Sequence, residues 1–505
     1  YFLPFNQGSN GAGNPGGKGN PSNPNGYVTS YLWEKVFTKE SLLDLIHRFI
    51  TITEEKKETM VNGVVKKSIV KKLIFPRYHQ YDVVHKVLDD VKEHGSGRNY
   101  LIEHSAGSGK SNSIAWIAYR LASVFNEDEK PIFDTVIVVT NRIVLDSQLQ
   151  DTINSFEHKA GVVEAITQAK GSKGLIEAIN DKRKIIICTV QKFLFAYKDF
   201  DKVAGRNFAI IIDEAHQGQS GESARTLRKS LTDIEAERKK YAEENGIDVE
   251  DIDESDDLME EIYAQGHHDN QSFFAFTATP IKKTLQVFGR KENDGAYHTF
   301  HVYSMKQAIE EGYILDVLQN YLTIKQAFKL VKDTEGNPEL IEGSAKRALF
   351  KYYKGHDFTI EQKVEMIMDN FLNNGRMKIN GHGKAMVVCD SRHNAVKFYF
   401  AIKDYIKNHP DTCQGVNALV AFSGSVKFDD DPTEYVEAKM NKDSEGHYIQ
   451  SDKKFRQAFH GDDFNIMVVA NKYQTGYDEP YLHSMYVDKK LKGVSAVQTL
   501  SRLNR

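Results

Sequence analysis

Short apolar segments alternate with longer helical segments along much of this 505-residue chain, and that alternation restricts its fold more than any other feature. A strand that is buried on both faces reads as a continuous apolar run, and strands that alternate with helices form parallel sheets. The runs form two series, at Leu101-Ile102, Thr135–Val139, Ile185–Ile187, Phe208–Ile212 and Phe273–Phe276, and then at Ala385–Val388, Ala418–Phe422, Ile466–Val469 and Ser484–Val487. Two series predict two α/β lobes, each a mostly parallel sheet flanked by helices.

The segment before the first series has a different character. Residues 6–26 are almost entirely Gly, Asn, Pro and Ser, which favours a linker or a surface loop. Residues 29–50 carry a recurring apolar face and predict helix, and residues 56–75 predict a hairpin about Asn62-Gly63. The expected divisions are a linker at 1–28, a helix and hairpin at 29–75, a first lobe at 76–300 and a second lobe at 301–505.

The net charge of −4 is unevenly distributed. Residues 233–261 hold fourteen Asp or Glu against three Lys or Arg, so we expect a solvated, helix-forming insertion at 233–266 within the first lobe. The rest of the chain is mildly basic, which permits contact with a phosphate backbone. No apolar run is long enough to span a membrane. Three widely spaced cysteines exclude a disulfide framework and indicate reduced thiols in a cytoplasmic protein.

The strongest local motif is Ala106–Ser111, which lies between a strand-like and a helix-like segment. Gly107 and Gly109, with Ser108 between them, let successive backbone N–H groups converge on a phosphate at a helix N-terminus. Lys110 is expected to reach the β- and γ-phosphates of ATP, and Ser111 to bind Mg²⁺. His104 stands where the general pattern has glycine. The motif predicts an ATP site.

A second motif follows about a hundred residues later, at Asp213-Glu214 after the apolar run 208–212. The carboxyl ends of parallel strands meet at one edge of the sheet, where nucleotides bind. Asp213 suits Mg²⁺, and Glu214 suits the base that aligns and deprotonates the attacking water.

Asp213–His216 is the box that names a class of superfamily-two helicases and translocases, and the chain resembles that superfamily, which implies two tandem RecA-like lobes. The matching segments, in order, are Phe75–Gln80, Ala106–Ser111, Asn141–Leu145 with Gln148, Thr189–Phe193, Asp213–His216, Thr277–Pro280, Cys389–Arg392, Thr475–Asp478 and Gln498–Arg505. The resemblance implies nucleotide contacts for Gln80, Gly476 and Asp478. It implies coupling of hydrolysis to lobe movement for His216, Thr277 and Thr279. The DNA contacts that it implies are Arg142, Gln148, Thr189, Gln191, Lys192, Arg392 and Thr475.

The resemblance also implies that the last motif contributes Gln498, Arg502 and Arg505 to catalysis. Residues three apart share one face of a helix, so the two arginines would face the same way. From the second lobe they would stabilise charge on the γ-phosphate, so hydrolysis would require the lobes to close.

Several segments, some of them outside these general motifs, resemble the motor (R) subunit of type I restriction enzymes. The segments that carry this are Phe2–Gly8, Thr29–Glu34, Pro76–Gln80, Thr189–Phe193 and Ser501–Arg505. The resemblance implies an ATP-dependent translocase of double-stranded DNA that works with modification and specificity subunits, downstream of a nuclease domain. The nearest match to a nuclease core, Glu361–Lys363, lies in a helical stretch, so we expect an excised motor core.

Two alternatives remain from the sequence. One is a strand-separating helicase, or a type III restriction or repair ATPase. The other is a non-catalytic ATP-binding scaffold, which would need to have lost a catalytic residue, although Lys110, Asp213, Glu214 and Arg502 are all present.

Overall fold

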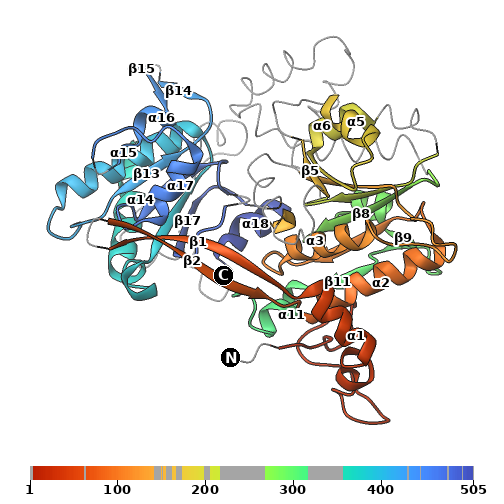
Figure 1. The fold of residues 1–505 in the computed structure, drawn as a ribbon. Helices are drawn as coiled ribbons and strands as arrows, with labels where there is room; N and C mark the ends of the chain where they lie inside the picture. The colour runs from red at the N-terminus through yellow and green to blue at the C-terminus, as the bar shows by residue number, and fades with distance from the viewer. Residues whose placement is uncertain are drawn as a thin grey trace. The chain divides into compact units, whose positions relative to one another are not determined.

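The computed structural model describes residues 4–61, 64–140, 149, 152–154, 162–166, 173–197, 205–215, 268–316, 357–428, 431–443, 445–474, 477–491 and 493–503. These residues form two compact units, the first ending at Ile314 and the second beginning at Leu315. Each unit is built around its own sheet (Figure 1). No helix among the described residues is long and apolar enough to cross a membrane.

The first unit holds a seven-stranded sheet in the order β11-β3-β8-β7-β4-β6-β5, with every neighbouring pair parallel. The strands are β3 (Tyr100–His104), β4 (Thr135–Thr140), β5 (Val163–Ala165), β6 (Ile185–Thr189), β7 (Phe208–Ile212), β8 (Gln271–Thr277) and β11 (His301–Tyr303). All five predicted strands are confirmed. The two that the sequence did not predict have three residues each, too few to show a pattern.

Burial on both faces explains the continuous apolar runs. Alternate residues of β4, such as Val138 and Val139, enter separate apolar cores on opposite faces of the sheet. Helices α2 (Tyr78–His94) and α3 (Lys110–Leu121) supply the first core. Helices α5 (Lys173–Asn180), α6 (Val190–Tyr197) and α10 (Lys282–Phe288) supply the second (Figure 1).

The second unit repeats this plan with four parallel strands in the order β13-β16-β12-β17. They are β12 (Lys384–Cys389), β13 (Ala418–Ala421), β16 (Ile466–Ala470) and β17 (Leu482–Asp488), which confirms the four predicted strands. Helices α14 (Asp357–Asn370) and α15 (Arg392–Asn408) pack on one face, and α17 (Asp452–His460) on the other. The predicted fold class, two parallel α/β sheets flanked by helices, is confirmed.

The side chain of Asn441 covers the middle of the edge of β13. The amide of Asn441 accepts from the Val420 N–H at 2.9 Å and donates to the Val420 carbonyl at 2.7 Å. Asn441 is fully buried, so it takes the place of a neighbouring strand at that point.

The two units also contain smaller elements among the described residues. They are α11 (Met305–Glu310), α16 (Glu437–Met440), α18 (Gly493–Leu500), the pairs β9 (Arg290–Lys291) with β10 (Tyr297–His298) and β14 (Ser425–Phe428) with β15 (Asp431–Val436), and the short helices η6 (Phe371–Gly375), η7 (Ile379–Gly381) and η8 (Ser501–Leu503).

In the segment before the first sheet, the helical stretch is divided into three pieces: η1 (Leu32–Val36), α1 (Lys39–Asp44) and η2 (Leu45–Phe49). The hairpin follows as β1 (Thr51–Val61) and β2 (Val64–Ile74), paired antiparallel. Residues 62–63, between the strands, lie outside the described residues.

The Gly/Asn-rich segment is an ordered surface loop that lies against the first unit. The N–H of Gly8 donates to the carbonyl of Gly19 at 2.8 Å, and the N–H of Val302 donates to the carbonyl of Gly13 at 2.8 Å. The loop thereby covers the edge strand β11 with its own backbone. Since β11 pairs with β3, the first unit continues past the boundary that we expected at residue 300.

Candidate functional site

The phosphate loop has the backbone that its glycines predict. Gly107 and Gly109 have φ values of +77° and +82°, in the left-handed region that favours glycine. A Cβ on Gly107 would lie 2.8 Å from Ile314 Cγ2, and one on Gly109 would lie 2.8 Å from Gln80 Nε2. Gly109 is the N-cap of α3, which begins at Lys110. A side chain at either position would therefore strain the backbone and would have to displace Ile314 or Gln80.

The surroundings of the loop fit a phosphate. The Ser105 and Ser108 hydroxyls are buried and have no hydrogen-bond partner among the described residues. A buried hydroxyl without a partner is costly, and an anion that accepts from it removes the cost. The start of α3 adds its N–H groups and partial positive charge. The loop can hold the phosphates of ATP, and the hydroxyl of Ser111 and the carboxylate of Asp213 are the kind of oxygen ligand that Mg²⁺ prefers.

The acidic motif lies in the same unit and reaches the loop. Lys110 Nζ is 3.3 Å from Glu214 Oε1, and the two side chains are only 11% and 27% exposed. Glu214 has φ +56°, a left-handed conformation that a non-glycine residue adopts only when its surroundings impose it. The flanking N–H groups impose it here, because Asp213 donates to the Val139 carbonyl at 3.0 Å and Ala215 to the Phe276 carbonyl at 2.8 Å. The sheet thus turns the Glu214 carboxylate toward Lys110.

Gln80 connects α2 to the phosphate loop. Its Nε2 donates to the Gly109 carbonyl at 2.9 Å, and its Oε1 accepts from the Arg77 N–H at 2.9 Å. The structure adds this bridging position to the nucleotide contact that the resemblance implies for Gln80, and that contact stays a prediction.

The segment expected to couple hydrolysis to movement ends β8. Thr277 is fully buried, and its Oγ1 accepts from the Thr279 N–H at 3.1 Å. The Ala215–Phe276 hydrogen bond joins this segment to the acidic motif. His216 lies outside the described residues.

The expected DNA contacts are only partly described. Thr189 is the buried last residue of β6, and Lys192 Nζ donates to the Ile166 carbonyl at 2.5 Å. In the second unit Arg392 Nη1 donates to the Ser423 carbonyl at 3.1 Å. Their role toward DNA stays a prediction. The residues Arg142, Gln148 and Thr475, and the side chain of Gln191, lie outside the description.

The last motif is held to the segment before β17. Arg502 Nη1 donates to the Tyr477 carbonyl at 3.1 Å, and Arg502 Nε donates to the Gln498 carbonyl at 3.2 Å. The structure ends α18 at Leu500 and continues with the short turn η8. Asp478 is exposed. Gly476 and Arg505 are not described, so the shared helical face of the two arginines stays a prediction.

Three buried histidines lie near the phosphate loop, a cluster that the sequence did not predict. His79 stacks on Tyr303, with ring centroids 3.6 Å apart, and its Nε2 is 3.2 Å from the Ser108 carbonyl. His104 Nε2 is 2.9 Å from His301 Nδ1. Desolvation by burial lowers the pKa of all three imidazoles, so they are neutral. The only sequence signal was His104 at the position of a motif glycine.

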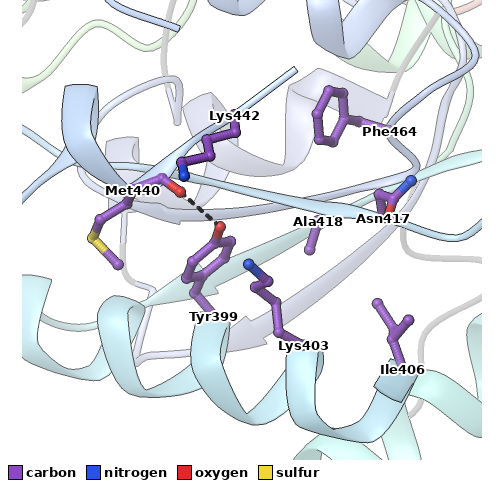
Figure 2. A pocket seen from close by; sticks show the side chains of 8 residues that line it. All are labelled: Tyr399, Lys403, Ile406, Asn417, Ala418, Met440, Lys442 and Phe464. Carbon is purple, nitrogen blue, oxygen red and sulfur yellow. Dashed lines mark hydrogen bonds between the residues drawn. The ribbon is translucent and has the colours of Figure 1, made fainter. Parts of the chain in front are cut away.

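The second unit contains a cavity of about 270 Å³ beside α15 and the start of β13. Figure 2 shows the Tyr399 hydroxyl directed at the Met440 carbonyl, 3.0 Å away, with Lys403 and Lys442 nearby. The motif residues follow the carboxyl ends of the strands, whereas Ala418 begins β13. The cavity is therefore separate from the motif residues of this unit.

Two family models match the chain. The model of the SWI2/SNF2 ATPase matches residues 79–237, which include both the phosphate loop and the acidic motif. The model of type I restriction enzyme subunit R domain 3 matches residues 433–505.

Whole-chain relatives agree with these matches. The chain is 26% identical to the type I restriction enzyme HindI endonuclease subunit of Haemophilus influenzae, over 92% of this chain and 40% of the relative. It is 24% identical to the SsaAORF53P endonuclease subunit of Staphylococcus saprophyticus, over 86% of this chain and 43% of the relative. Among solved structures, a fragment of an HsdR subunit from Vibrio vulnificus matches with TM-score 0.47 and 17% identity, over 85% of this chain and 61% of that one. The chain thus spans less than half the length of these two curated relatives.

Proposed function

We propose that this chain, a relative of the endonuclease subunits of type I restriction enzymes, hydrolyses ATP in order to move along double-stranded DNA. The observation that carries the proposal is the 3.3 Å contact between Lys110 and Glu214. This contact joins two motifs about a hundred residues apart, and it supports the proposed roles of Lys110 in binding phosphate and of Glu214 as the base.

The ion pair suggests how ATP binding prepares the site. Lys110 is balanced by the Glu214 carboxylate, and a γ-phosphate is a competing anion for the same ammonium. When Lys110 turns to the phosphate, Glu214 becomes available to orient a water molecule and accept its proton. Asp213 and Ser111 would hold Mg²⁺, which supplies positive charge to the phosphates.

The second unit would complete the reaction. Arg502 and Arg505 would stabilise the charge that develops on the γ-phosphate, with Gln498 beside them. Because these residues belong to a different unit from Lys110, binding and turnover depend on different parts of the chain. Alternate closing and opening would then move DNA held by Arg142, Gln148, Thr189, Gln191, Lys192, Arg392 and Thr475.

The relatives support a wider proposal about partners and location. We propose a cytoplasmic motor that works with modification and specificity subunits and serves a nuclease domain. A strand-separating helicase is the alternative, and a triplex-displacement assay distinguishes the two. We expect displacement of a triplex-forming strand without unwinding of a forked duplex. Efficient fork unwinding without triplex displacement would favour the helicase.

The ATPase itself is tested with Lys110→Ala in the intact subunit. We expect loss of DNA-stimulated phosphate release, because the ammonium that binds the phosphates is gone. Lys130→Ala is the matched control, since Lys130 is 74% exposed and remote in sequence from the motif. Near-normal turnover of Lys110→Ala would refute the site.

A further inference from the structure

The Gly/Asn-rich segment has contacts that a covering loop alone does not need. We call residues 7–19 the glycine loop. Two backbone hydrogen bonds close it, from Gly8 N–H to the Gly19 carbonyl at 2.8 Å and from Ser9 N–H to the Gly17 carbonyl at 2.9 Å. Its carbonyls also accept hydrogen bonds from the first unit, with Gly13 bound by Val302 N–H at 2.8 Å and Gly16 by Ser304 Oγ at 2.7 Å.

Gly13 marks the closest approach to the interior of the unit. A Cβ at this position would lie 2.8 Å from His301 Cδ2 and 2.9 Å from Lys86 Nζ, both too close for real atoms. Lys86 Nζ donates to the carbonyl of the preceding Ala12 at 2.6 Å and lies 2.8 Å from Asp82 Oδ2. The glycine loop therefore rests directly on the imidazole of His301, which is fully buried.

His301 in turn contacts the residue that opens the phosphate loop. Its Nε2 is 3.0 Å from Asp82 Oδ2, and its Nδ1 is 2.9 Å from His104 Nε2. A carboxylate only accepts, so the His301 proton lies on Nε2 and His104 Nε2 must donate to His301 Nδ1. This order of hydrogen bonds runs from Asp82 to His104 and fixes the orientation of the His104 ring. The neutral state of both imidazoles, caused by burial, is the state that this order requires.

The phosphate loop starts at that ring. Ser105, next to His104, donates its N–H to the Tyr303 carbonyl at 3.0 Å, so β11 holds the backbone on the other side as well. The path from the glycine loop to the ATP-binding backbone thus consists of Gly13, His301 and His104, in direct contact at each step.

We propose that the glycine loop is a positioning element for ATP binding. Its packing on His301 holds the His301–His104 hydrogen bond, and that bond holds the start of the phosphate loop in the geometry that receives ATP. His104 and His301 are positioning residues, since they act on the nucleotide through the backbone. This inference rests on the proposed ATP site. On this proposal the ATP site depends on the glycine loop, which precedes both sheets in the sequence.

The test compares two alanine substitutions in the same loop. Gly13→Ala and Gly11→Ala impose similar backbone strain, since their φ values are +78° and +88°. They differ in what the new Cβ meets, because at Gly11 it lies 3.7 Å from Asn14 Nδ2, an ordinary contact. We expect Gly13→Ala to raise KM for ATP by roughly threefold to tenfold, the value of one hydrogen bond. The kcat at saturating ATP should change by less than about twofold, and Gly11→Ala should change neither constant.

A double-mutant cycle separates positioning from general destabilisation. If Gly13→Ala acts through the His301–His104 bond, it should have no further effect on KM when His104→Ala is already present. Additive effects, or equal effects of Gly13→Ala and Gly11→Ala, would overturn the inference.

A measurement made without nucleotide tests the packing of the glycine loop independently of the proposed ATPase function. Nitrogen-15 NMR of labelled histidine side chains should show the hydrogen-bonded signals of His104 and His301 in the unmodified chain and in Gly11→Ala. Those signals should be lost in Gly13→Ala, and their persistence there would also overturn the inference. If the unmodified chain failed to bind ATP while these signals behaved as expected, the ATP site would be wrong and the packing argument would stand.

Discussion

The two units hold their motif side chains by different means. In the first, Lys110 faces the carboxylate of Glu214 at 3.3 Å. In the second, Arg502 donates to the backbone carbonyls of Tyr477 and Gln498. An anion can replace the Glu214 carboxylate at Lys110 without a change of fold, whereas the contacts of Arg502 also hold the end of the chain to the segment before β17. The first unit is therefore suited to exchanging one anion for another, and the second to fixing an arginine in place.

The largest expected effect is a loss of ATP turnover without a loss of ATP binding. Arg502→Ala should lower kcat for ATP by about 10³-fold, since an arginine that stabilises transferred phosphate contributes on this order. It should leave the affinity for ATP nearly unchanged, whereas Lys110→Ala should weaken it. Titration of a fluorescent ATP analogue measures affinity, and phosphate release measures turnover. If Arg502→Ala lowers the affinity for ATP as much as Lys110→Ala does, the two units do not differ in this way.

Glu214→Gln should lower kcat by about 10²-fold, because the amide cannot accept the proton of water. The same change removes the carboxylate that competes for Lys110, so ATP should bind at least as tightly as before. Equilibrium binding together with single-turnover hydrolysis provides both values. Glu127→Gln, at an exposed position, is the matched control. Weaker binding of ATP by Glu214→Gln would contradict the proposal that the γ-phosphate replaces the Glu214 carboxylate at Lys110.

A third prediction uses the edges of the two sheets, which are covered by backbone in one unit and by a side chain in the other. Asn441→Ala leaves the buried N–H and carbonyl of Val420 without partners and should cost about 2 kcal/mol of stability in the second unit. Hydrogen exchange at the Val420 amide reports the loss locally. Asn373→Ala, which removes an exposed bond to Asp369, should have little effect. Similar exchange rates in both variants would show that Asn441 does not protect the edge.

The smallest effect per residue is the pH dependence of the first unit. Desolvation by burial lowers the pKa of His79, His104 and His301 below 6.5 in the folded chain. The unfolded chain then binds more protons below about pH 6.5, so stability is complete above that value and falls as the pH falls. Each histidine should add at most about 1.4 kcal/mol per pH unit, the slope for one proton that the unfolded chain binds and the folded chain does not.

Tryptophan fluorescence measures this dependence selectively. The chain has two tryptophans, Trp33 and Trp116, and both lie in the first unit. Urea unfolding followed by their fluorescence at several pH values gives the slope. His104→Asn should make it shallower. An unchanged slope would mean that His104 does not contribute.

The sequence predicted most of the strands of the two parallel sheets because they are buried on both faces, although β17, an edge strand, is only partly buried. Runs such as Ile210–Ile212 have no polar alternation, so their position could be found without knowledge of the fold. The strand β11 could not, because its three residues owe their place to pairing with β3. The motif glycines predicted the phosphate loop because their conformations are local.

The rest of the site depends on contacts between distant residues. His104 and His301 are 197 positions apart, and no local pattern indicates that their rings meet. Composition left a linker and a surface loop open for the glycine loop, because backbone hydrogen bonds and close packing without side chains leave no apolar signature. The motifs predicted that Lys110 and Glu214 serve one ATP site, but they predicted neither the ion pair between the two side chains nor the left-handed backbone of Glu214.

The packing of the glycine loop against the rest of the first unit has a practical consequence for the design of truncated or tagged variants. A stretch rich in Gly and Asn is the usual choice for a protease site, an affinity tag or an expression boundary. Here such a cut would uncover the N–H of Val302 on an edge strand, and an uncovered edge is a site for pairing between molecules. A preparation shortened within residues 7–19 should therefore aggregate, even though every residue of both sheets would still be present.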